Sequence, residues 1–194
     1  LTYREFHQLV SGLKIASKQL RDFSNDNDAA AFQLNVFGGL FLDSSSFTPN
    51  EKFEAILNKV RQAIRYDDPD QKVTLSNYQS AKSDVFEPFN ARHRYLIGNF
   101  VRTQMLATPS VFNLNNKSAK NQLHKIATKT AAVRFVIIGL AFHNAHEFNK
   151  QTYVDCISSV LRAIEHNAEL LRGIERILNR QNDDRLVLNN LLLV

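Results

Sequence analysis

Apolar side chains recur along most of this chain at steps of three and four residues, the spacing that places them on one face of an α-helix. The first such stripe consists of Phe6, Leu9, Val10, Leu13, Ala16, Leu20 and Phe23. Residues 131–142 are apolar almost all round, which predicts a central helix buried by its neighbours. The sequence therefore predicts an all-α domain of about six to seven helices in orthogonal or bundle-like packing, with no sheet.

Caps and helix breakers place the expected ends of the first helices. Thr2 and Glu5 form a capping box that opens the first helix, and a second helix is expected over residues 29–42. Pro49 is expected at the first position of the next helix, because proline is tolerated there. Residues 67–83 contain a proline, several Asp and Ser and little periodicity, which predicts the longest loop of the chain.

Caps and helix breakers also mark the expected helix ends in the second half of the chain. One helix is expected from Phe89 to Met105, and Ser118 is expected to cap the long central helix. A further helix is expected to begin near Asn149 and to end at a joint formed by residues 166–167. The apolar tail at residues 186–194 is expected to dock on the rest of the domain, because it would otherwise leave an exposed apolar patch.

Length and cysteine content limit the class of protein. A chain of 194 residues fits one domain, so residues 1–194 are expected to form a single helical unit. Cys156 is the only cysteine, which excludes an intrachain disulfide or a local thiolate site for zinc or an iron–sulfur cluster and favours the cytoplasm.

Residues 131–142 are too short to span a bilayer and carry Arg134, so no membrane is expected as a partner. Because the only methionine is Met105, we expect a C-terminal fragment of a longer protein.

The charge distribution favours an acidic partner but not a nucleic acid. The net charge is +5 and the pI is about 9.4. Basic residues are spread along the chain and are not interleaved with exposed aromatics, as single-strand binding would require. No glycine-rich phosphate loop is present. His143, His146 and Glu147 lack the spacing of a zinc helix, so no metal site is predicted there.

One arginine lies within the most apolar predicted helix. Arg134 is expected to need a carboxylate or carbonyl partner, because a buried guanidinium is costly without one. Arg162 and His166 lie four residues apart and share a helix face, with Glu165 beside them. The cluster is interpreted either as a structural polar lock between two helices, or as a polar site in a cleft where Glu165 or His166 accepts a proton or binds an amine.

Three segments of this sequence resemble a known family. They are residues 95–101 (YLIGNFV), the apolar helix at residues 133–141 (VRFVIIGLA), and the hexapeptide at residues 162–167 (RAIEHN), which is the most specific of the three. Together they resemble the C-terminal half of the flagellin lysine-N-methylase family, over about residues 89–178. The first eighty residues add no motif to this resemblance.

The resemblance implies an activity, cofactors and a partner. The family implies transfer of methyl groups from S-adenosylmethionine to lysine ε-amines of flagellin in the cytoplasm. It also implies an iron–sulfur cluster in a cysteine-rich N-terminal region, whose cysteines are absent from this chain. Under this resemblance Glu165 and His166 are candidate catalytic residues, and Arg134 and Arg162 are candidate substrate-binding residues.

Two functional hypotheses remain open at this point. In the first, the chain is the catalytic part of a protein-lysine methyltransferase. In the second, it is a helical docking module that binds flagellin or another acidic protein while the chemistry resides elsewhere in the enzyme. The two hypotheses differ in whether this chain alone binds the methyl donor. The sequence does not set the oligomeric state.

Overall fold

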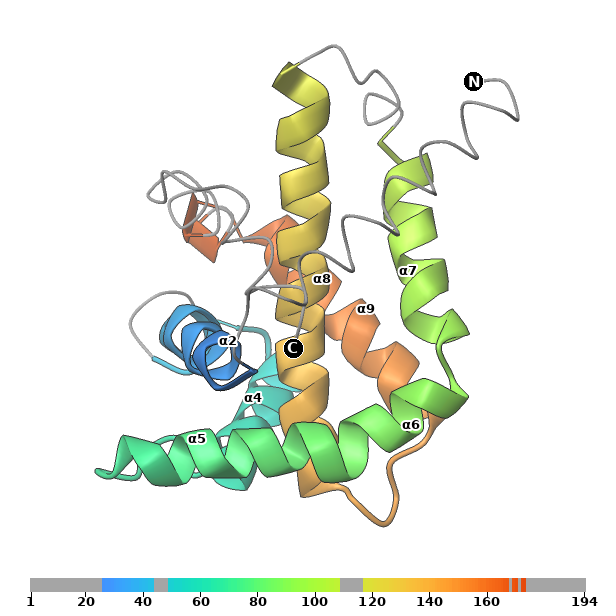
Figure 1. Cartoon of the computed structure of the whole chain (residues 1–194). Coiled ribbons are helices and arrows are strands. Elements are labelled where there is room, and N and C mark those ends of the chain that lie inside the picture. The colour runs from blue at the N-terminus through green and yellow to red at the C-terminus, as the bar shows by residue number, and fades with distance from the viewer. Residues whose placement is uncertain (1–25, 44–48, 109–116, 168, 171, 174–194) are drawn as a thin grey trace.

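The fold was examined in a computed structural model of the chain, shown in Figure 1. The structure describes residues 26–43, 49–108, 117–167, 169–170 and 172–173. The helix expected from Thr2 to Phe23 and the apolar tail at residues 186–194 lie outside the described residues.

The described residues form helices joined by short connections and contain no strand, which confirms the all-α fold class. Two of the elements, η1 and η2, are π-helical and continue directly into α-helices. In chain order the elements are α2 (Asp26–Gln33), η1 (Leu34–Gly38), α3 (Gly39–Phe41), α4 (Glu51–Ile64), α5 (Gln71–Ser80), η2 (Ala81–Phe86), α6 (Glu87–Arg92), α7 (Tyr95–Leu106), α8 (Lys117–His143) and α9 (Lys150–His166).

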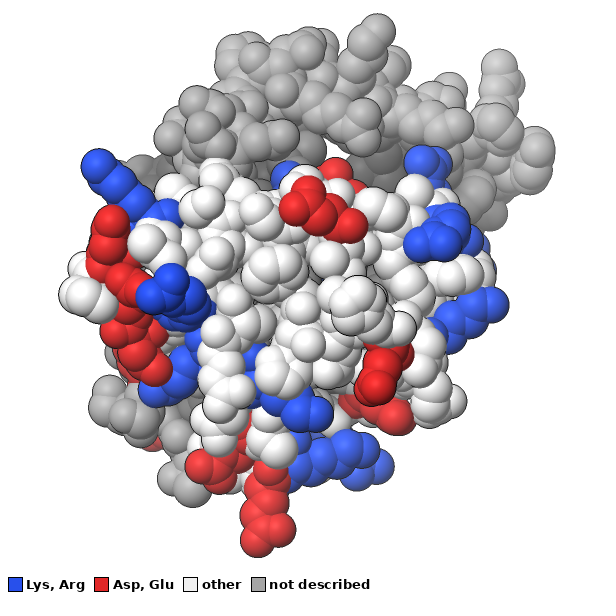
Figure 2. Space-filling model, turned by 90° about the horizontal axis from the view of Figure 1, so that it is seen from below, with Lys and Arg blue, Asp and Glu red and all other residues white. Residues whose placement is uncertain are grey.

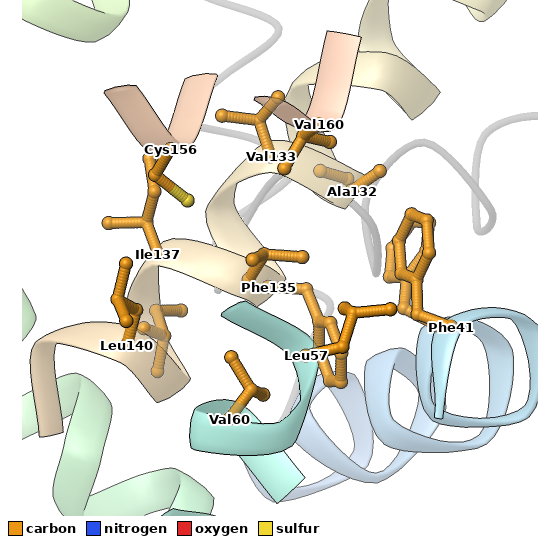
Figure 3. Close-up of a cluster of buried hydrophobic side chains, with 14 of the residues drawn as sticks. Phe41, Leu57, Val60, Ala132, Val133, Phe135, Ile137, Leu140, Cys156 and Val160 are labelled. Carbon is orange, nitrogen blue, oxygen red and sulfur yellow. The ribbon is translucent and has the colours of Figure 1, made fainter. Parts of the chain in front are cut away.

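Helix α8 is the centre of the fold, as the sequence predicted (Figure 1). It is 27 residues long, and α4, η2 and α9 all pack against it. Residues 131–133 and 135–138 are fully buried, so its C-terminal half is covered on nearly every side. Figure 3 shows this half of α8 between side chains of α9 and side chains of α3 and α4.

By length and composition alone, one described segment could cross a membrane. Residues 122–143 form a 22-residue apolar helix, longer than the run at residues 131–142 on which the sequence expectation was based. However, 78% of its most apolar window is buried inside the fold. Burial to this extent is typical of the core helix of a folded domain.

An aromatic cluster joins α8 to the N-terminal helices. The ring of Phe135 lies 5.8 Å from that of Phe37, 6.5 Å from that of Phe41 and 5.4 Å from that of Tyr78, measured between centroids. These distances are typical of favourable aromatic pairs. The Tyr78 hydroxyl, fully buried, donates a hydrogen bond of 2.6 Å to Oε1 of Gln33, so its polar end is satisfied within the core.

Helices α4 and α8 pack closely where Val60 faces Gly139. A Cβ atom built on Gly139 would lie 2.5 Å from Cγ1 of Val60, well inside van der Waals contact. Val60 is itself fully buried. Only a residue without a Cβ atom lets the two helices approach this closely at that point.

The stretch at residues 67–83 is not the long loop that the sequence predicted. It contains α5 and the first half of η2, and the only connection is the short turn before Gln71. The Asp70 side chain caps α5 by accepting a hydrogen bond of 3.0 Å from the amide of Lys72. The helix buries only Thr74 and Tyr78, one turn apart, so its apolar stripe was too narrow to be recognised in the sequence.

Three other expected boundaries were also wrong. The helix expected from Phe89 to Met105 is broken at His93, where φ is −128° and ψ is 34°, so it forms the separate helices α6 and α7. Pro49 is not the first helical residue, because Asn50 caps α4 by accepting a hydrogen bond of 2.9 Å from the amide of Phe53. Ser118 falls inside α8 rather than before it.

The boundaries of α9 were predicted correctly. Asn149 is its N-cap and accepts a hydrogen bond of 3.0 Å from the amide of Thr152. The helix ends at His166, and Asn167 leaves the helical conformation with φ of −120° and ψ of 103°. These ends coincide with the expected start near Asn149 and the expected joint at residues 166–167.

The Gly139 contact gives a test of the packing. Replacing Gly139 by Ala should destabilise the fold by roughly 1–3 kcal/mol, because the new methyl group would overlap Val60 and force α4 away from α8. Urea unfolding followed by circular dichroism measures the change. The double variant Gly139→Ala, Val60→Ala should recover part of the loss relative to Val60→Ala alone, because the smaller side chain makes room.

Gly98 supplies a matched control on α7. No atom outside its own helix lies within 4 Å of a Cβ atom built there, so Gly98→Ala should be neutral or stabilise the helix by up to about 1 kcal/mol. Equal effects of the two alanine substitutions would contradict the close contact between α4 and α8.

Candidate functional site

The structure places Arg134 at the junction of η2, α6, α8 and α9. Its Cζ atom lies 5.5 Å from the centroid of the Phe86 ring, a cation–π contact. Burial lowers the pKa of Arg134, and the nearby Tyr78, Tyr153 and Glu87 act in the opposite direction. A guanidinium keeps its proton in proteins, so a positive charge is held here in largely apolar surroundings.

Glu165 is paired with a different cation from the one expected. Its Oε1 atom lies 3.3 Å from Nζ of Lys129, at the edge of the contact between α8 and α9. Lys129 and Arg134 are five residues apart, which is about 140° around the helix axis, so they project to different sides of α8. The expected lock between Arg134 and Glu165 is therefore wrong, and Glu87 is the carboxylate whose charge supports Arg134.

The other two sequence candidates lie on the surface at the end of α9. Arg162 and His166 are both exposed, as is Glu165. Arg162 lines a surface hollow of about 630 Å³ between the start of α4 and α9. The remaining lining residues carry both charges and hydroxyl groups and are Asn50, Glu51, Lys52, Asp155, Ser158 and Ser159. The structure thus brings Arg162, Glu165 and His166 together on one helix end but leaves Arg134 elsewhere.

A second hollow, of about 690 Å³, was missed by sequence reasoning because it borders the segment expected to be a loop. Asp43, Tyr66, Asp67 and Asp68 form its polar side. The Tyr66 hydroxyl donates a hydrogen bond of 3.3 Å to Oδ1 of Asp43, and burial, followed by the charge of Asp43, raises the pKa of Tyr66 to about 12. The clustered aspartates at residues 67–70 were the available signal.

The carboxylates of this second hollow are already partly neutralised. Asp67 lies 3.4 Å from Nη1 of Arg61, and Asp68 lies 2.7 Å from Nη2 of Arg65. Lys72 also lines the hollow. The hollow therefore offers a cation little uncompensated negative charge.

The structure does not favour a metal or iron–sulfur centre in the described part of the chain. Among the described residues no group of three or more His, Cys, Asp or Glu side chains is placed to hold a metal ion. His143 and His146, considered as ligands in the sequence, therefore form no such group with their neighbours. Cys156 is buried and is the only cysteine of the chain, so the four thiolates of an iron–sulfur cluster cannot come from these residues.

The burial of Cys156 predicts an unreactive thiol. Burial raises the pKa of this thiol, so the nucleophilic thiolate is scarce at pH 8 in the folded protein. A disulfide reagent such as dithionitrobenzoate should react with the native chain at least roughly a hundredfold more slowly than with the chain unfolded in urea. Equal rates in the two states would contradict the buried position.

Comparison with known proteins yields one match. The family model described as the FliB lysine N-methylase C-terminal domain matches residues 3–191. No curated protein and no solved structure matches the chain. The match covers nearly the whole sequence and agrees with the resemblance found in residues 95–101, 133–141 and 162–167. The chain therefore belongs to the FliB lysine N-methylase C-terminal domain family.

Proposed function

We propose that this chain is a domain of an enzyme that transfers methyl groups from S-adenosylmethionine to lysine side chains of flagellin. The observation that carries the proposal is the family match over residues 3–191. The all-α architecture, with neither a sheet nor a glycine-rich phosphate loop in its described part, means that donor binding on a nucleotide-binding βαβ unit is not part of the proposal.

Methyl transfer to lysine makes definite demands on the residues around the amine. S-adenosylmethionine supplies an electrophilic methyl group on a sulfonium. The lysine nitrogen must first lose a proton, because only the neutral amine has a lone pair to donate. Glu165 and His166 are adjacent in the chain, so a carboxylate and an imidazole are available at one helix end to accept that proton. Arg162, one turn earlier, is placed to hold an acidic group of the protein substrate.

A docking role has a specific observation in its favour. Glu165 and His166 are exposed, and Glu165 already pairs with Lys129. An exposed, ion-paired carboxylate is a weak base for an amine, but it is well suited to bind a basic side chain of a partner. The second candidate function is therefore recognition of flagellin by the surface at the end of α9, with the chemistry performed elsewhere in the enzyme.

Nucleic acid is not proposed as a partner. Figure 2 shows a face of the described molecule on which Lys and Arg side chains alternate with Asp and Glu around a mostly uncharged middle. A nucleic-acid surface needs basic residues gathered into one patch, and this face does not gather them.

The Glu165 carboxylate provides a test of the catalytic candidate. In the complete enzyme, Glu165→Gln should lower the methylation rate of flagellin by roughly 10²–10⁴-fold if Glu165 accepts the proton. Mass spectrometry of modified flagellin measures the rate. The stability should change by less than about 1 kcal/mol, because the Glu165 side chain of the pair with Lys129 is about half exposed and solvent screens the interaction.

Glu169→Gln is the matched control. Glu169 is exposed just after α9, four residues further along the chain, and pairs with Arg172, so its loss should leave the methylation rate unchanged. A rate for Glu165→Gln within about threefold of that control would remove Glu165 from the chemistry, since general-base catalysis contributes far more than this.

Calorimetry on the chain distinguishes the two roles. Saturable heat on titration with S-adenosylmethionine is expected if the domain carries the donor site. If no heat is found at high micromolar donor, while flagellin still binds in a manner that Arg162→Ala weakens, the chain is the docking module.

A further inference from the structure

Two polar atoms lie buried without a hydrogen-bond partner where α6, α8 and α9 meet. They are the hydroxyl oxygen of Tyr153 and Oδ1 of Asn90. Tyr153 has no exposed surface at all. Buried polar atoms in folded proteins almost always have a partner, so two such atoms at one junction indicate that something polar belongs between these helices.

The contacts around these atoms place them in one region. The Tyr153 ring stacks on that of Phe89, with centroids 5.8 Å apart, and Phe89 precedes Asn90 on α6. Asn90 lies one turn after Phe86 and therefore on the same helix face. The guanidinium of Arg134 lies over the ring of Phe86. Burial raises the pKa of Tyr153, and the charge of Arg134 acts in the opposite direction.

The local backbone is also unusual. Asn90 and Phe86 flank the point where the π-helix η2 passes into α6. Segments of π-helix often accompany functional sites, because the wider turn reorients the side chains on either side. In Figure 1 the rod formed by α5 and α6 crosses α8 beside the start of α9, which is where Tyr153 lies.

The polar groups in this region fall into two sets, one suited to bind a carboxylate and one suited to bind an ammonium group. Arg134 and the Tyr153 hydroxyl offer a positive charge and a hydrogen-bond donor, which suit a carboxylate. Asn90 Oδ1 and the carboxylate of Glu87 offer acceptors and a negative charge, which suit an ammonium group. The buried Lys82 ammonium lies 3.6 Å from Glu87, so it balances part of that charge. A carboxylate and an ammonium a few ångströms apart are the head group of an α-amino acid.

We propose that the junction of α6, α8 and α9 binds the head group of an α-amino acid, with its carboxylate on Arg134 and Tyr153 and its ammonium on Asn90 and Glu87. Arg134 and Asn90 are partly buried and Glu87 is exposed, whereas Tyr153 is fully buried, so the groups span the depth from the surface to the core. The head group belongs to a free amino acid or to the methionine end of S-adenosylmethionine. Binding of S-adenosylmethionine here rests on the proposed function, whereas binding of a free amino acid does not.

Titration calorimetry of the chain with L-methionine and with S-adenosylmethionine tests the site. Both ligands are expected to give saturable heat, and methionine methyl ester, which lacks the carboxylate, should bind at least roughly tenfold more weakly because a charge-assisted hydrogen bond is lost. Tyr153→Phe removes only the hydroxyl group and should weaken both ligands roughly ten- to a hundredfold.

The variant also has a stability readout that does not depend on any ligand. Because the Tyr153 hydroxyl has no partner in the free protein, Tyr153→Phe should not lower the urea midpoint. Tyr95→Phe is the control, since Tyr95 is 49% exposed on α7 and should affect neither the binding nor the midpoint.

The outcomes separate this proposal from the proposed function. No heat from either ligand, or heat that Tyr153→Phe leaves unchanged, overturns the site. Methionine binding that depends on Tyr153, without binding of S-adenosylmethionine, supports the head-group site and removes the donor from it. Donor binding that is insensitive to Tyr153 overturns the site and leaves the methyltransferase proposal standing.

Discussion

The fold depends on one constraint, which is that the C-terminal half of α8 is apolar on every side and must be covered on every side. Phe135 shows how the constraint is met, because its ring contacts the rings of Phe37, Phe41 and Tyr78 from three different elements. On another side Gly139 removes the side chain that would hold α4 away. The neighbouring helices are short and only partly apolar, so each is stable where it covers α8 rather than by itself.

Polar side chains on α8 find their partners in two ways, within the helix itself or on another element. Thr128 and Thr130 direct their hydroxyl groups back to the carbonyl oxygens of His124 and Ile126 one turn earlier, so they need no partner from another helix. Lys129 and Arg134 carry charges that no local bond can satisfy, and each lies where another element brings an acidic or aromatic group. The two charges therefore mark the two polar regions that a mostly apolar helix can support.

Sequence periodicity predicted the elements whose apolar face is broad and failed where the face is narrow. Helix α4, expected close after Pro49, buries Phe53, Leu57, Val60 and Ile64 on one broad face. Helix α5 was missed because Thr74 and Tyr78 are its only buried side chains. The partner of Arg134 could not be predicted, because periodicity shows that α8 is buried all round but not which helix covers which side. For the same reason the unpartnered atoms of Tyr153 and Asn90 had no signal in the sequence.

The exposure of Glu165 limits how it can take part in methylation. A lysine amine has a pKa of about 10.4, so freeing its lone pair at pH 7 costs roughly 5 kcal/mol in water. A carboxylate at an exposed position stabilises the charged ammonium and increases that cost. Only removal of water reverses the effect, because desolvation favours the neutral amine and raises the basicity of the carboxylate together. Since Glu165 is exposed among the described residues, any group that covers it must come from outside them. The surface at the end of α9 is thus a catalytic candidate only when such a cover is present.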